Sequence, residues 1–146
     1  MRLMRMFLRL SAGKRMLLVK SALVVGSIRI ALWILPFRVL RDLPRRMKNA
    51  ARAHGLDSIS ISDVAWAVRV SSRCVPFATC LTQALAAQVL MARLGHQAHL
   101  RIGVAKSSKG SLKAHAWVEC AGIIVIGRVP DISLYKMLSH HDEETA

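Results

Sequence analysis

The sequence predicts an α+β fold in which N-terminal helices and one buried central helix pack on a small antiparallel sheet. The central helix is predicted from Cys80 to Leu94, where apolar side chains occupy two neighbouring helical faces. Thr79 before it is a good N-cap, and Gly95 after it is a natural C-terminal stop. Three β-like runs follow, separated by polar or glycine-containing turns, at about residues 98–104, 113–120 and 123–126.

The first third of the chain is both apolar and basic. Residues 16–35 are long enough to span a bilayer, but Lys20 and Arg29 would point to opposite faces of a helix. Hiding both charges in lipid would cost about 2.5–3.5 kcal/mol each, and the basic lead-in and missing cleavage site fit a signal peptide poorly. We therefore expect a helix that packs on the domain while its basic residues snorkel outward. A helix lying on a membrane surface is the next alternative, ahead of a spanning one.

Proline and turn-forming residues indicate the structure of the segment between this helix and the central helix. Pro36 and Pro44 are expected to interrupt a solvated basic run that extends to residue 52. Residues 54–63 read as a linker or turn. Ser62 or Asp63 is then expected to cap a short helix that ends at about Arg69.

The net charge of +14 is concentrated in the N-terminal third. Residues 1–55 hold thirteen Lys and Arg against one acidic residue, whereas residues 56–146 hold nine against seven. We expect two parts: a basic, apolar, helical region (1–55) that packs on or docks to the core, and an enzymatic domain (56–146). Only three Phe, three Trp and one Tyr are present, which disfavours a stacking platform for single-stranded nucleic acid.

Three cysteines, Cys74, Cys80 and Cys120, cannot all pair. No secreted disulfide framework is implied, and a cytoplasmic location is the simpler interpretation. The spacing of cysteine and histidine matches no zinc motif, so we expect neither metal nor cofactor.

Cys80 and His115 are the candidate catalytic residues. Cys80 lies in the first turn of the central helix, where the helix dipole and free N–H groups favour a thiolate and could hold an oxyanion. Alternation in AHAWVE puts His115, Trp117 and Glu119 on one face of a strand. A cysteine at a helix start with a histidine on a strand is the nucleophile-and-base arrangement of cysteine proteases and transglutaminases. The alternatives are a small buried cysteine and a hydrogen-bonded structural histidine.

The motifs P-x-x-T-C-L-x-x-A-L, L-R-I-G-V and A-H-A-W-V-E occur together here. With the flanking GIIVIG, this combination closely resembles the lasso-peptide leader peptidase family, and in particular the stand-alone protease half of the split B protein, related to the microcin J25 processing protein. The resemblance is strong over residues 62–128. It is weaker at LWILPFRVL, which looks like the apolar, Pro-containing entry segment of that family.

The resemblance implies a papain/transglutaminase-like cysteine protease with Cys80 as nucleophile and His115 as base. Its substrate would be a lasso-peptide precursor, whose freed core would pass to an asparagine-synthetase-like macrolactam cyclase. The family uses a small leader-recognition module for which this chain shows no room, so we expect a separate leader-binding partner. We expect the basic N-terminal region to be a docking surface for that partner or for an acidic leader.

The sequence indicates the group that orients His115 less clearly than it indicates Cys80 and His115. A two-residue turn at Ala121–Gly122 would pair Cys120 with Ile123 and place His115 opposite Arg128, which cannot orient a histidine as a carboxylate does. Asp131 is the nearest downstream acid and is our prediction. A backbone carbonyl or a water is the alternative.

Two other functions remain open at this point. One is a different acyl-transfer enzyme on the same fold, such as a transglutaminase or an amidase. The other is a basic module that binds nucleic acid or an anionic membrane through residues 1–55, which predicts salt-dependent binding that survives loss of Cys80. It leaves the C-terminal pattern unexplained, so we expect no nucleic-acid partner, whereas contact of the N-terminal region with a membrane surface remains open.

Overall fold

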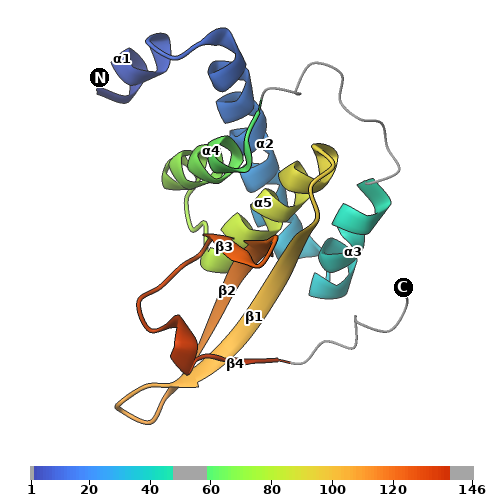
Figure 1. The fold of residues 1–146 in the computed structure, drawn as a ribbon, viewed down its shortest axis with the longest axis vertical. Coiled ribbons are helices and arrows are strands. Elements are labelled where there is room, and N and C mark those ends of the chain that lie inside the picture. The colour runs from blue at the N-terminus through green and yellow to red at the C-terminus, as the bar shows by residue number, and fades with distance from the viewer. Residues whose placement is uncertain (1, 48–58, 139–146) are drawn as a thin grey trace.

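The computed structural model describes residues 2–47 and 59–138. Figure 1 shows helices gathered on one side of a small sheet, which confirms the predicted α+β class. The helices are α1 (Arg2–Leu8), α2 (Ala12–Ile34), α3 (Phe37–Met47), α4 (Ile61–Cys74) and α5 (Cys80–Arg93). The strands are β1 (Ala98–Lys106), β2 (Leu112–Cys120), β3 (Ile123–Ile126) and β4 (Lys136–Met137), and a short 3-10 helix, η1 (Ile132–Leu134), precedes β4.

The sheet is antiparallel with the strand order β3-β2-β1-β4. β1 and β2 form a long hairpin, in register from Ala98 opposite Cys120 to Lys106 opposite Leu112. The predicted turn between β2 and β3 is confirmed: Cys120 pairs with Ile123, and Ala121 and Gly122 both have positive φ, as a two-residue hairpin turn requires. β4 adds two residues to the free edge of β1.

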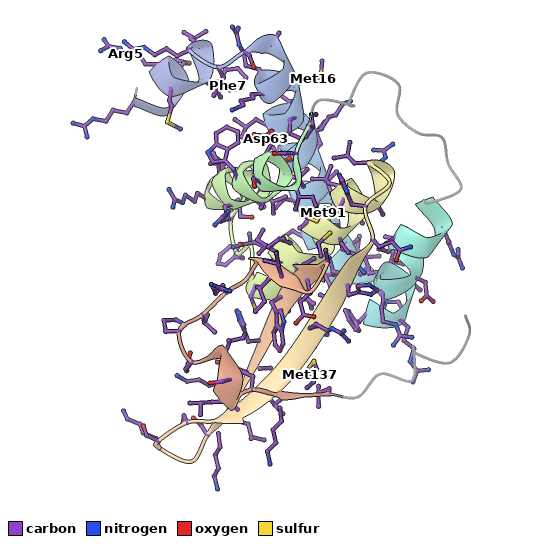
Figure 2. The ribbon with its side chains drawn as sticks, in the orientation of Figure 1. Arg5, Phe7, Met16, Asp63, Met91 and Met137 are labelled. Atoms are coloured by element: carbon purple, nitrogen blue, oxygen red, sulfur yellow. The ribbon has the colours of Figure 1, made fainter. Side chains whose placement is uncertain are left out.

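The core lies between α5 and one face of the sheet. Ala84, Ala87 and Met91 of α5 are fully buried, and they belong to one cluster with Ala116 and Val118 of β2. Figure 2 shows Met91 among the packed helices. Small side chains on α5 let the sheet and the neighbouring helices approach closely, so this helix is the centre of the fold.

The predicted central helix is confirmed, with Thr79 as its N-cap. The Thr79 side chain accepts a hydrogen bond from the Thr82 N–H, and the Thr82 hydroxyl accepts one from the Thr79 N–H. This reciprocal capping box fixes where α5 starts. The start matters because it sets the position of Cys80.

The expected boundaries of α4 were wrong at both ends. Ser60 caps the helix, and Asp63 completes a capping box as its third residue instead of serving as the cap. The helix continues past Arg69 to Cys74 because Ser71 and Ser72, which look like a polar stop, are buried. Their hydroxyls donate to the carbonyls of Leu18 and Val68, so helix and core both tolerate them.

The N-terminal segment is more helical than expected. α2 starts at Ala12 behind the cap Ser11, and α3 runs through Pro44, which was expected to interrupt the chain. A proline inside a helix removes its own N–H from the ladder and crowds the carbonyl one turn earlier, and here its ring is buried. Both helices pack on α5, and Figure 1 shows α2 passing behind α4 and α5. The predicted linker up to residue 58 and the expected boundary at residue 55 lie outside the described residues.

Within the described ranges, α2 alone is long and apolar enough to cross a membrane, judged by length and composition. One face of the helix is nevertheless part of the core, through Leu17, Val25 and Ile28. The expectation of a helix that packs on the domain is therefore confirmed.

Candidate active site

Cys80 is the first residue of the central helix. Its side chain is half-buried and packs against the core cluster. In the described part of the chain, the N–H groups of Cys80 and Leu81 have no hydrogen-bond acceptor, whereas the next two, of Thr82 and Gln83, bond to Thr79. The two free donors point out of a helix end that favours negative charge. They can therefore stabilise a thiolate or an oxyanion beside the sulfur.

The loop that leads into Cys80 carries a strained aromatic residue. Phe77 has φ of 59°, in the left-handed region that a bulky side chain rarely occupies, and its side chain is 77% exposed. Such a conformation costs of order 1–3 kcal/mol and persists only where the surrounding structure imposes it. Neither packing nor solvation explains an exposed, strained Phe three residues before the candidate nucleophile.

His115 lies on β2 with its ring held by the backbone after β3. Its Nε2 is 2.6 Å from the carbonyl oxygen of Gly127. A carbonyl can only accept, so Nε2 must carry the proton. This hydrogen bond selects the tautomer in which Nδ1 is unprotonated and free to act as a base.

Two aromatic side chains flank the histidine ring. Trp117 stacks on it at a centroid distance of 6.2 Å with an interplanar angle of 21°, and Tyr135 is tilted against it at 5.6 Å. Gly103, opposite His115 across the hairpin, leaves room for them: a Cβ there would come within 3.0 Å of the Trp117 ring and of the Tyr135 Cβ. The ring of His115 is thus positioned from several sides.

Glu119 has a structural explanation within this arrangement. One of its carboxylate oxygens accepts from the Trp117 indole N–H at 3.0 Å, and the other accepts from Arg101 at 3.2 Å. A buried indole N–H needs such an acceptor. The last residue of the AHAWVE motif therefore fixes the tryptophan that stacks on His115.

The predicted register beyond the turn was wrong. A bulge between Val118 and Glu119 shifts the pairing, so that Val118 lies opposite Ile126, and β3 then ends. His115 therefore does not face Arg128. The extra residue of the bulge brings the Gly127 carbonyl to the histidine instead.

The structure does not join Cys80 to His115 by a hydrogen bond, although both are described. α5 packs on the face of β2 that carries Ala116 and Val118, whereas His115 points to the face that carries Trp117. Both are linked to β3: α5 contacts this strand, and His115 bonds to the residue that follows it.

Asp131 takes no part in the hydrogen bond of His115. It precedes η1, its side chain is exposed, and it has no partner within the described residues. A role for Asp131 in catalysis stays a prediction.

Sequence reasoning missed most of the residues that hold His115. Trp117 was placed on the correct strand face without a role, and Gly103, Gly127 and Tyr135 were not singled out. The glycine before Arg128 closes GIIVIG, but only the bulge and the positive φ of Gly127 (83°) reveal why it is needed. Tyr135 lies between η1 and β4, and neither of these short elements has a periodic sequence pattern that would predict it.

The chain combines a helix that begins with cysteine and an antiparallel sheet that carries a positioned histidine. This combination is typical of enzymes with cysteine-based acyl-transfer chemistry. A comparison with protein families agrees. The model of the transglutaminase-like superfamily matches residues 22–140, which is most of the chain. The chain therefore belongs to the transglutaminase-like superfamily. Comparisons with curated proteins and with solved structures gave no significant match.

Proposed function

We propose that this chain is a cysteine peptidase that removes the leader from a lasso-peptide precursor, with Cys80 as nucleophile and His115 as base. Membership of the superfamily supports acyl-transfer chemistry in general. The narrower role rests on the combined motifs around Cys80, Arg101 and His115. The observation that carries the proposal is the hydrogen bond of His115 Nε2 to the Gly127 carbonyl, because it leaves Nδ1 as the free base.

In the proposed mechanism, His115 Nδ1 removes the proton of Cys80, and the thiolate attacks the scissile carbonyl of the precursor. The N–H groups of Cys80 and Leu81 stabilise the oxyanion that forms. Protonated His115 then donates its proton to the leaving amine, which becomes the N-terminus of the core peptide. Water resolves the leader thioester and regenerates the thiol.

The Gly127 carbonyl is proposed to orient His115 in place of a carboxylate. An orienting group must accept from Nε2–H and hold the ring plane, and a carbonyl does both without adding charge. The hydrogen bond favours this assignment over Asp131, which has the carboxylate but not the contact. The chemistry requires Cys80 Sγ and His115 Nδ1 to come within hydrogen-bond distance in the complex with substrate, although no hydrogen bond joins them in the free chain.

The biological setting is part of the same proposal. We expect the chain to act in the cytoplasm with a separate leader-binding protein, and to pass the freed core to an asparagine-synthetase-like cyclase. Full cleavage of the precursor by this chain alone, with no gain on adding the leader-binding protein, would remove the need for that partner.

The test is a cleavage assay read by mass. The purified chain is mixed with the precursor and the leader-binding protein encoded beside it. We expect hydrolysis at one leader–core bond, lost in Cys80→Ala and kept in Cys74→Ala, because Cys74 is an exposed thiol on α4 and is a matched control. Cross-linked products would indicate a transglutaminase on the same fold. Cleavage that persists in Cys80→Ala would reject the nucleophile.

A further inference from the structure

The outer face of α2 is apolar and uncovered. The inner face packs on α4 and α5, and its buried residues are Leu17, Ser21, Val25 and Ile28. The opposite face consists of exposed apolar side chains: Met16, Val19, Leu23, Ile30, Trp33 and Ile34. Soluble helices normally place polar residues there, and Leu23, Ile30 and Trp33 are 66%, 63% and 77% exposed.

Positive charge accompanies this face. Residues 2–34 contain seven Lys and Arg and no Asp or Glu. Lys20 and Arg29 lie on either side of the apolar stripe, by the 100° rotation per helical residue. The Arg29 guanidinium lies over the Trp33 ring at 5.2 Å. Arg2, Arg5 and Arg9 are exposed on α1 and the turn after it. Figure 2 shows Arg5 at the same end of the molecule as Met16.

We propose that α2 lies in the surface of an anionic membrane, with its outer face in the acyl boundary and the α1 arginines, Lys20 and Arg29 on lipid phosphates. The pattern matches an interfacial helix: an apolar face, cations beside it, and an aromatic residue at one end. A spanning helix would have to pull Leu17, Val25 and Ile28 out of the core, whereas an interfacial one leaves them in place. Charge complementarity selects anionic lipid over a neutral surface.

The experiment is co-sedimentation of the full chain with lipid vesicles of phosphatidylcholine, with and without phosphatidylglycerol. We expect partitioning at least about tenfold stronger on the anionic vesicles, weakened by salt. Leu23→Ser/Ile30→Ser/Trp33→Ser should lower it by more than about tenfold, because the acyl boundary loses three apolar side chains. The control is Leu112→Ser/Ile123→Ser/Leu134→Ser, which also replaces three exposed apolar side chains by serine, but around the sheet, and should keep the binding.

A second measurement does not depend on the triple variant folding. Brominated phospholipid should quench the fluorescence of the wild-type chain on anionic vesicles, and Trp33→Phe should remove most of that quenching. The proposal is overturned by equal or absent binding to the two vesicle types, by equal effects of the two triple variants, or by unchanged quenching in Trp33→Phe. A dimer in solution that the α2 variant dissolves, without vesicle binding, would assign the face to a second copy and also overturn it. Precursor cleavage in detergent-free solution tests the peptidase separately.

Discussion

Gly127 meets two demands that exclude a side chain at its position. Its φ of 83° lies in the left-handed region, and a Cβ there would come within 2.7 Å of the Ala116 carbonyl oxygen and 2.9 Å of the Trp117 Cα. The same residue supplies the carbonyl that holds His115. The same glycine therefore allows the close backbone approach and orients the proposed base.

Gly127→Ala is expected to lower the free energy of unfolding by about 2 kcal/mol or more and to move the carbonyl away from Nε2. The ring nitrogens, followed by 15N NMR, should then lose the preference for the Nε2–H tautomer, and precursor cleavage should fall. Gly122→Ala is the matched control, because φ there is also positive (76°) but its Cβ would meet nothing within 4 Å. An unchanged tautomer in Gly127→Ala would contradict the role given to the carbonyl.

At Phe77 we expect a substitution to glycine to stabilise the fold. Because the residue is strained and exposed, Phe77→Gly should raise the free energy of unfolding by about 1 kcal/mol. We expect it also to raise KM for the precursor, since the aromatic ring lies near Cys80 in sequence and faces solvent. Ala121→Gly, at a second left-handed and exposed residue (φ 52°), should stabilise the fold without changing KM. Equal kinetics in both variants would leave Phe77 without a part in substrate binding.

Asp131 is tested by a conservative exchange. Asp131→Asn changes an exposed carboxylate that touches no described group, so kcat/KM should stay within about twofold of wild type. A loss of more than tenfold, with the fold intact by circular dichroism, would restore Asp131 as the orienting acid and displace the Gly127 carbonyl from that role.

Among the elements, α4 is tied to α2 through one carboxylate. Asp63 accepts hydrogen bonds from the Ser60 N–H and hydroxyl, and it lies 3.7 Å from the Lys14 ammonium of α2 (Figure 2). These hydrogen bonds, and then the nearby Lys14, lower the pKa of Asp63. Capping of α4 and its attachment to α2 thus depend on the charged form of the same side chain.

The lowered pKa of Asp63 gives a pH prediction. The stabilisation is complete above the ordinary pKa of an aspartate, and it is lost as the pH falls through the lower pKa of the folded state. Asp63→Ala should therefore cost about 1 kcal/mol at neutral pH, as lost caps do. Urea unfolding should show the two proteins converging in acid. A gap that stays constant down to low pH would show that the charge of Asp63 contributes nothing.

For the whole molecule, the elements with local sequence signals were predicted correctly, whereas those that depend on tertiary contacts were not. Periodicity and the cap at Thr79 placed the central helix, and glycine at 122 placed the hairpin turn. The bulge at Val118, the short β4 and the helix through Pro44 depend on contacts between distant segments, which a local pattern does not contain. The candidate site divides in the same way: Cys80 and His115 have local signatures, whereas Gly103 and Tyr135 act through tertiary packing around the ring.

Covalent catalysis by Cys80 is tested most directly by mass spectrometry of the enzyme during precursor cleavage. The Cys74→Ala chain is quenched in acid early in the reaction, so that Cys80 is the one thiol in its tryptic peptide. We expect a thioester adduct with the mass of the leader on Cys80, absent in Cys80→Ala and depleted in His115→Ala. A leader adduct on another residue, or cleavage that proceeds without Cys80, would contradict it.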